Sequence, residues 1–286
     1  MASSPSPSPS PSPSLPTSPA SGLFAGRYTI ECVIGRGATA TVHLARDPER
    51  GIAVAIKILR SELAESSAVA GFLREIRRTS GLQHPHILAV LDSGESAGLP
   101  YIVLPYMEGG SLRQLLKRER ALELPRVALI TRTIAGALDY AHKHGLIHRD
   151  VKPENILFTD GQACLGDFGI ARAIESVYGD APRSSGIIRG TYSYMSPEQA
   201  AGAEDLDGRS DIYSLACVVY EMITGVRAFI GPQRDVRPSK VRAHRPTAPA
   251  SIDRALAKAF AVRPADRYRT AVELAERLEA TLASNS

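Results

Sequence analysis

Residues 148–169 read HRDVKPENILFTDGQACLGDFG, and the rest of the chain is best interpreted by working outward from them. Asp150 offers a carboxylate that can take up a proton from a hydroxyl nucleophile. Asn155 and Asp167 offer oxygen ligands for a hard cation such as Mg²⁺, and Lys152 places a positive charge near the carboxylate. A loose phosphoryl-transfer transition state mainly needs positioning and charge neutralisation, so these groups suit phosphoryl transfer.

The order and spacing of two motifs make this stretch specific. H-R-D-x-x-x-x-N followed by D-F-G matches the catalytic loop and the magnesium loop of protein kinases, whereas a lone Asp or Asn in a loop is usually a solvated turn residue. The chain resembles the eukaryotic-type serine/threonine protein kinases, bacterial members most of all, over roughly residues 26–283. The resemblance implies an α+β, two-lobed protein-kinase fold, with a β-rich N-lobe at about 26–106 and an α-helical C-lobe at about 107–283.

Composition excludes several other classes. The 286 residues are 44% hydrophobic, enough for a substantial core, and the net charge of +4 comes from scattered basic residues, so no nucleic-acid partner is expected. The odd cysteine count without C-x-x-C spacing predicts buried free thiols at Cys32, Cys164 and Cys217. No apolar run is long enough to cross a bilayer, so no membrane segment is expected. A cytoplasmic location is predicted, and tethering to a membrane by a segment after Ser286 is left open.

The N-terminal residues differ sharply in composition from the rest. Fifteen of the first twenty residues are Ser or Pro, and such a segment cannot bury enough apolar surface to offset its ordering entropy. Residues 1–22 are therefore predicted to be a disordered tail of polyproline-II character, and residues 23–283 to be the kinase domain. The tail is interpreted as a spacer, with a docking or phospho-acceptor role as the alternative.

The first nucleotide-binding element is predicted where two strands meet at glycines. Residues 28–34 read as a strand, and residues 35–42, GRGATATV, resemble the kinase Gly-rich loop G-x-G-x-x-G-x-V. Gly35 and Gly37 allow close approach of phosphate oxygens, while Ala40 replaces the third glycine. Two glycines between strands are otherwise more often a plain hairpin. The resemblance assigns ATP binding to Ile34, Gly35, Arg36, Gly37, Ala38, Thr39, Ala40, Thr41, Val42, Ala55, Lys57, Leu104, Pro105, Met107 and Leu157.

A lysine inside an apolar strand marks a second nucleotide contact. Lys57 ends the run Val-Ala-Ile-Lys in residues 53–59, where an unpaired charge would be costly. The resemblance implies that Lys57 pairs with the ATP phosphates and with Glu75, on a helix predicted for about residues 66–80. The alternative is a lysine on the solvent face of a strand.

The next segment resembles the hinge between kinase lobes. Strands are predicted at about residues 87–91 and 101–104. The resemblance makes Leu104 the gatekeeper, and the carbonyl of Pro105 with the amide and carbonyl of Met107 would bond the adenine edge. Proline at position 105 still offers its carbonyl.

The C-terminal part is predicted to be mostly helical. In residues 124–144 the apolar positions recur at spacings of 3 and 4, which predicts one buried helix face. Short apolar runs at 156–158 and 163–165 predict a small hairpin that carries the Asp167 loop. A Thr-x-x-Glu capping box predicts a last helix at 271–283.

The segment after Asp167 resembles a kinase activation segment. It covers residues 170–195 and ends before Ser-Pro-Glu, where the family usually has Ala-Pro-Glu. Ser184 and Ser185 are the predicted regulatory phosphorylation sites, and Thr191 is predicted to face the catalytic Asp and Lys. The alternative is an ordinary polar loop that is never phosphorylated.

Three further features follow from the same resemblance. Glu198 is predicted to form a buried ion pair with Arg267, and Asp211 to hold the backbone of the catalytic loop. Residues 225–249 depart most from the family, because four prolines interrupt them and make a regular helix unlikely there.

The resemblance implies an ATP-dependent kinase that transfers the γ-phosphoryl group to Ser or Thr hydroxyls of protein substrates, in bacterial signalling with autophosphorylation through a transient homodimer. ATP and Mg²⁺ are the expected cofactors, with Mn²⁺ as a substitute. A pseudokinase-like nucleotide-binding scaffold would lose one of the catalytic residues, and a small-molecule phosphotransferase would lack residues 190–198. The predicted catalytic residues are Asp150, Lys152, Lys57 and Glu75, and the predicted metal ligands are Asn155 and Asp167.

Overall fold

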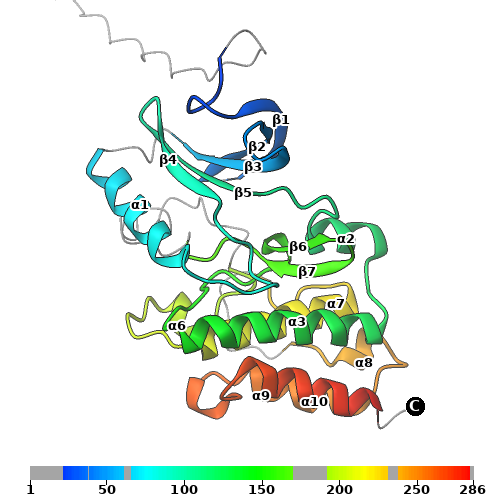
Figure 1. Ribbon diagram of the computed structural model, residues 1–286. Helices are drawn as coiled ribbons and strands as arrows, with labels where there is room; N and C mark the ends of the chain where they lie inside the picture. The colour runs from blue at the N-terminus through cyan, green and yellow to red at the C-terminus, as the bar shows by residue number, and fades with distance from the viewer. Residues whose placement is uncertain (1–21, 38, 61–65, 170–191, 231–237, 284–286) are drawn as a thin grey trace, which may run out of the picture.

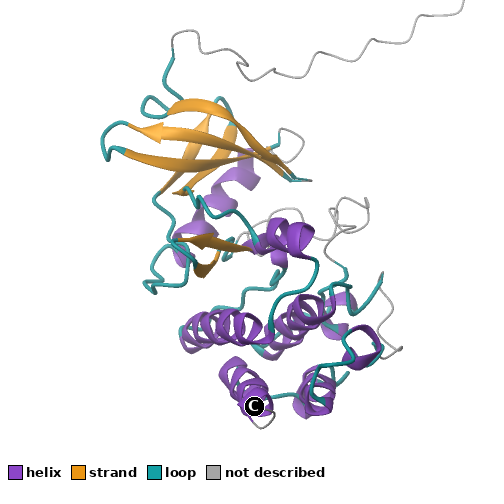
Figure 2. Ribbon diagram, turned by 90° about the vertical axis from the view of Figure 1, so that its right-hand side faces the viewer, coloured by secondary structure: helices purple, strands orange, loops and turns teal. Residues whose placement is uncertain are grey.

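The computed structural model has a sheet-based lobe and a helical lobe (Figures 1 and 2). The residues that it describes are 22–37, 39–60, 66–169, 192–230 and 238–283. The fold agrees with the predicted two-lobed α+β architecture. Several predictions concern residues outside these ranges, namely the Ser/Pro-rich tail, Ala38, Ser184, Ser185 and Thr191.

The N-lobe is a five-stranded antiparallel sheet in the order β1-β2-β3-β5-β4. Helix α1 packs beside strands β4 and β5 (Figure 1), where Phe72 and Ile76 are fully buried with Leu59 and Ile102. The elements are β1 (Thr29–Arg36), β2 (Ala40–Asp47), β3 (Ile52–Leu59), α1 (Ser66–Thr79), β4 (Asp92–Ser96) and β5 (Leu99–Pro105).

One predicted strand is misplaced. The sequence places a strand at residues 87–91, but the structure has β4 at Asp92–Ser96. Residues 87–91 do not form a strand with one neighbour. The Leu88 amide donates to the Leu165 carbonyl in the C-lobe, and the Leu91 amide donates to the Val103 carbonyl on β5. The polar residues that follow pair with β5, and Gly94 fits there because a Cβ would lie 2.8 Å from the Tyr101 hydroxyl.

The C-lobe core surrounds helices α3 and α7, which lie side by side in Figure 1. The predicted helix and hairpin are confirmed, and α7 is buried at every residue from Ser210 to Ile223. The elements are α2 (Leu112–Glu119), α3 (Leu124–Lys143), η2 (Pro153–Asn155), β6 (Ile156–Thr159), β7 (Gln162–Leu165), α6 (Pro197–Ala200), α7 (Arg209–Thr224), α8 (Val241–His244), α9 (Ala250–Ala259), η3 (Pro264–Asp266) and α10 (Ala271–Ala283).

Helix α10 begins as predicted, but its first amides are capped by a side chain of α3 as well as by Thr270. The Thr270 hydroxyl accepts from the Glu273 amide at 3.2 Å. The Asp139 carboxylate on α3 accepts from the Ala271 and Val272 amides at 2.7 and 3.1 Å. Because the first amides of a helix have no partner within it, Asp139 fixes α10 against α3.

The predicted burial of the three cysteines is correct for two of them, and the predicted lack of a regular helix agrees with the structure in the described part of residues 225–249. Cys32, predicted to be buried, is exposed, because it lies on the edge strand β1, most of whose residues face solvent. Cys164 and Cys217 are buried as predicted. Among the described residues of 225–249, the one helix is the single turn α8, in agreement with the predicted lack of a regular helix.

Candidate active site

The backbone of the catalytic loop is hydrogen-bonded to one buried carboxylate. Asp211 on α7 accepts hydrogen bonds from the His148 and Arg149 amides, each at 2.8 Å, as the sequence predicted. These bonds fix Arg149 at a φ of 67°, a left-handed conformation that costs energy in residues other than glycine. The ring of His142 binds the same carboxylate through Nε2 at 2.7 Å. Burial opposes ionisation of Asp211, but its hydrogen bonds outweigh burial and lower its pKa.

The loop that carries Asp167 is anchored by aromatic packing. The rings of His148 and Phe168 meet edge to face with centroids 4.5 Å apart, and His148 Nε2 lies 2.8 Å from the Gly166 carbonyl. Thr79 on α1 packs against Gly169, where a Cβ would lie 2.3 Å from the Thr79 methyl. The φ of 72° at Gly169 also favours glycine. Asp167 therefore projects from a loop whose path is fixed on both sides.

Asp150 is surrounded by groups that hold one of its two oxygens. Lys152 Nζ donates to Oδ2 at 2.7 Å, and Asn155 Nδ2 donates to Oδ2 at 3.0 Å and to the Asp150 carbonyl at 2.8 Å. The other oxygen, Oδ1, is buried and has no hydrogen-bond partner among the described residues. A buried acceptor left unsatisfied costs about 1–3 kcal/mol, so Oδ1 is the natural acceptor for a donor that enters the site.

Lys152 remains charged despite burial. Burial lowers its pKa, but the charge and hydrogen bond of Asp150, together with the charge of Asp167, outweigh burial and raise it. A fixed ammonium beside the carboxylate can therefore neutralise negative charge that develops on a transferred group.

The predicted pairing of Lys57 with Glu75 is not the one that the structure shows. Lys57 Nζ binds Asp167 Oδ2 at 2.8 Å, and the described ion pair of Glu75 is with Arg78 at 3.3 Å. Asp167 has a φ of 62°, which directs its carboxylate to β3. Burial raises the pKa of Asp167, but the charge of Lys57 outweighs burial and the pKa is lowered. Lys57 is thus paired across the two lobes.

The predicted metal ligands fit a hard cation chemically. Asn155 and Asp167 offer an amide oxygen and an ionised carboxylate, the donors that Mg²⁺ accepts. No group of three or more His, Cys, Asp and Glu side chains in the described part of the chain could hold a metal by itself. A Mg²⁺ ion here would need further oxygen ligands, which nucleotide phosphates and water supply in phosphoryl-transfer enzymes.

Strand pairing brings the predicted nucleotide-binding residues together. Val42 on β2 lies opposite both Gly35 on β1 and Lys57 on β3, and Ala55 lies opposite Leu104 on β5. Across the hinge, Leu157 on β6 forms a bridge with Ser111. Met107 is buried, and its carbonyl accepts from the Gly110 amide at 3.1 Å. Ala40 begins β2 with its methyl buried, which explains how alanine is tolerated at this position.

A partly buried ionic network beside the catalytic loop was missed by the sequence analysis. Arg113 on α2 binds Glu154 of the catalytic loop at 2.8 Å and Glu221 of α7 at 2.7 Å. The Tyr194 hydroxyl bonds to both Arg113 and Glu221. No spacing rule links these four residues, because they come from four separate segments. His142 was also missed as the partner of Asp211.

The predicted pair of Glu198 and Arg267 is confirmed. Both guanidinium nitrogens Nη1 and Nη2 bind the carboxylate, at 2.6 and 2.7 Å, and the Arg267 side chain is fully buried. Ser210 donates a further bond to Glu198 at 2.6 Å. The pair ties the segment after residue 191 to the base of the C-lobe.

Comparison with known proteins agrees with this geometry. The protein kinase domain family matches residues 28–268. The serine/threonine-protein kinase PknB of Mycolicibacterium smegmatis is 40% identical over 263 residues, which cover 87% of this chain and 42% of that protein. PknB of Mycobacterium tuberculosis is 40% identical over 262 residues, with the same two coverages of 87% and 42%. The chain therefore spans about two fifths of the length of these relatives.

A solved structure shows the same fold. The crystal structure of Rad53 in complex with AMP-PNP has a TM-score of 0.70 and is 25% identical to this chain. The alignment covers 88% of this chain and 65% of the Rad53 chain. Within the described residues, no helix is both long enough and apolar enough to cross a membrane.

Proposed function

The chain belongs to the protein kinase family, and we propose that it transfers the γ-phosphoryl group of ATP to Ser and Thr hydroxyls of protein substrates. The observation that carries this proposal is Asp150. One of its oxygens is held by Lys152 and Asn155, and the other is buried without a hydrogen-bond partner in the part of the chain that the structure describes. A substrate hydroxyl that donates to Oδ1 would satisfy this oxygen and be oriented for attack.

The residues of the site divide the work of phosphoryl transfer. As the substrate oxygen attacks the γ-phosphorus, its proton passes to Asp150, and the bond from phosphorus to the β-phosphate oxygen breaks. Lys152 neutralises charge on the transferred group. Lys57 lies within reach of phosphates placed under residues 35–42, because Val42 of that segment pairs with it across the sheet.

Two proposals concern the cofactors. ATP use is supported by the family and by the Rad53 relative, which was solved with the ATP analogue AMP-PNP. Asn155 and Asp167 would hold Mg²⁺, or Mn²⁺ in its place. When bound, the metal neutralises phosphate charge. Lys57 uses one of its three donors on Asp167, and the other two would be available for the phosphates and for Glu75.

The Ser and Thr acceptor class is proposed from Lys152, which lies two residues after Asp150 as in kinases specific for Ser and Thr. Protein substrates are proposed because the chain matches the protein kinase family. Autophosphorylation by a transient homodimer and a role in bacterial signalling are proposed with them. Ser184 and Ser185 stay predicted acceptors, since they lie outside the described residues. Glu75 stays a predicted catalytic residue on α1.

The test is a transfer assay with ATP that carries a radiolabelled γ-phosphate. Three peptides are compared that differ only in their acceptor, which is Ser, Thr or Tyr. Label in the Ser and Thr peptides and none in the Tyr peptide is expected. If the protein binds ATP with Mg²⁺ in a thermal-shift assay but labels no peptide, the chain is a nucleotide-binding scaffold and the proposal is wrong.

A further inference from the structure

A long groove lies on the C-lobe between α7, α8 and α9, and none of its lining residues belongs to the candidate active site. Its volume is about 1180 Å³, larger than the roughly 300–1,000 Å³ of most small-molecule sites. The walls are apolar and include Phe229, Val241, Leu256 and Phe260. A groove of this size and character suits a segment of polypeptide better than a small polar ligand.

Exposed apolar side chains occur in the lining of the groove and next to a lining residue in the sequence. Val262 lines it and is 60% exposed, and Ile230, next to the lining residue Phe229, is 91% exposed. Large aliphatic side chains in water are unfavourable when they gather beside an apolar hollow, and such patches mark binding surfaces. A partner seated in the groove would bury Val262.

The rim of the groove carries more positive than negative charge. Lys240, Arg242 and Arg254 line it, are exposed, and form no ion pair with the described residues. Of the two carboxylates in the lining, Asp266 is paired with an arginine outside the groove at 3.1 Å. Asp253 accepts the Val241 amide at 2.7 Å and keeps its negative charge, so the three cations still exceed it. A bound segment with acidic side chains would complement this rim.

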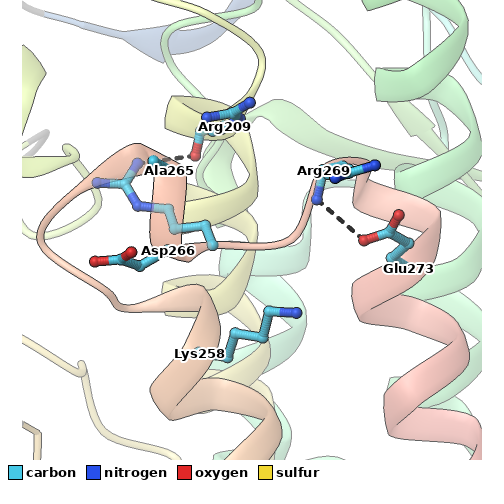
Figure 3. A pocket seen from close by; sticks show the side chains of 7 residues that line it. Arg209, Lys258, Ala265, Asp266, Arg269 and Glu273 are labelled. Carbon is cyan, nitrogen blue, oxygen red and sulfur yellow. Dashed lines mark hydrogen bonds between the residues drawn. The ribbon is translucent and has the colours of Figure 1, made fainter.

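A second hollow on the same lobe has charged walls in place of apolar ones. Figure 3 shows its lining, which includes Arg209, Lys258, Arg269, Asp266 and Glu273, and its volume is about 550 Å³. Basic and acidic groups are mixed, and the Arg269 amide already donates to Glu273 at 3.0 Å (Figure 3). It favours no class of ligand.

We propose that the groove between α7, α8 and α9 binds a partner protein through a segment with an apolar anchor flanked by Asp and Glu side chains. Phe229 and Phe260 already pack edge to face, with ring centroids 5.5 Å apart. The apolar side chain would therefore pack over the partly exposed Phe260, and the flanking carboxylates would meet Arg242 and Arg254. Residues 1–22 of this chain contain no charged side chain, so the tail does not match the basic rim. The proposal concerns binding and does not depend on phosphoryl transfer.

The test is fluorescence anisotropy with a fluorescein-labelled peptide, Glu-Glu-Asp-Leu-Phe-Asp-Asp-Leu-Glu-Glu. Two control peptides replace the acidic residues by Lys, or Leu and Phe by Ser. We expect the first peptide to bind best, and its affinity to fall as ionic strength rises because exposed charges are screened. Arg254→Glu should raise its Kd at least about tenfold, and Ala257→Trp should block the groove without changing charge, since Ala257 is an exposed lining residue.

The matched control is Arg118→Glu, which reverses an exposed arginine on α2 outside the groove and should leave the Kd unchanged. Equal melting temperatures would show that all variants are folded. Failure of the acidic peptide to bind, equal binding of the Lys peptide, or unchanged binding to Arg254→Glu and Ala257→Trp would overturn the proposal. Self-association in sedimentation that Arg254→Glu abolishes would also overturn it, because the occupant would then be a second copy.

Discussion

Asp150 and Asp167 are both carboxylates near Lys152, yet their surroundings prepare them for different work. Asp150 keeps one oxygen bound and, within the described ranges, one oxygen without a partner, which suits the proposed proton acceptor. Asp167 is paired with Lys57 and held ionised, as a metal ligand requires. The environment of each side chain therefore supports the role proposed for it and distinguishes the two carboxylates.

Asp167→Asn should remove most of the stabilisation that ATP and Mg²⁺ together give the protein. Asparagine keeps the shape and tolerates the left-handed φ of 62° at this position, but the metal site loses its negative charge. A thermal-shift titration with ATP and Mg²⁺ measures the effect. Asp160→Asn, in the exposed turn of the β6–β7 hairpin, is the control and should behave as wild type. The same shift in both variants would remove Asp167 from the metal site.

His142 should make stability depend on pH. Burial lowers its pKa, but the bond to Asp211 and the charges of Asp211, Asp139 and Asp207 outweigh burial and raise it above 6.5. The extra stability is therefore complete below about pH 6.5 and is lost as pH rises through the raised pKa of the folded state. Urea unfolding across this range should show the loss in wild type.

His142→Asn should abolish that dependence, because the variant has no titrating group beside Asp211. His144→Asn removes an exposed histidine bonded to the Tyr140 carbonyl and should keep the dependence. An unchanged pH profile in His142→Asn would show that another group carries it.

At the scale of elements, ion pairs between segments distant in sequence set the positions of the helices. Glu198 and Arg267 join α6 to the turn before α10, and Arg113 joins α2 to the catalytic loop and α7. Removing one partner from a buried pair leaves a charge that the interior cannot solvate.

Arg267→Met should therefore lower the free energy of unfolding by about 3–5 kcal/mol, measured by urea denaturation. The double variant with Glu198→Gln should cost less than the sum of the single changes, since both residues share one interaction. Arg263→Met removes an exposed arginine of a surface pair and should change nothing measurable. Equal effects of Arg267→Met and Arg263→Met would contradict the buried pair.

Elements with a strong local pattern could be predicted, and those set by tertiary contacts could not. The apolar period of residues 124–144 predicts α3 because its buried face is continuous. Strand β4 was misplaced because its residues are polar and pair with β5 only through the sheet. Helix α9 buries Ile252, Ala255, Leu256 and Ala259, and this spacing of 3, 1 and 3 is the local pattern that would predict the helix from sequence.

In the whole molecule, the ion pair between Lys57 and Asp167 is a charged contact between the two lobes. The motifs predicted both residues but not their pairing, because the position of α1 relative to β3 is a property of packing and not of local sequence. For the same reason the buried oxygen of Asp150 and the groove beside α9 could only be found in three dimensions.

Deletion of residues 1–22 should leave the melting temperature and the rate of peptide phosphorylation unchanged within error. The tail has the composition of a segment that buries no apolar surface. Scanning calorimetry and a peptide assay on the shortened protein measure both quantities. A loss of several degrees would show that the tail packs on the domain.

The central claim is that Asp150 accepts the proton of the substrate hydroxyl. The most direct measurement is the steady-state rate of peptide phosphorylation by Asp150→Asn, with kcat and the KM for ATP determined separately. Asparagine keeps the size of the side chain but cannot take up the proton, so kcat should fall about 10²–10⁴-fold while the KM for ATP changes little. A kcat equal to that of wild type would contradict the account.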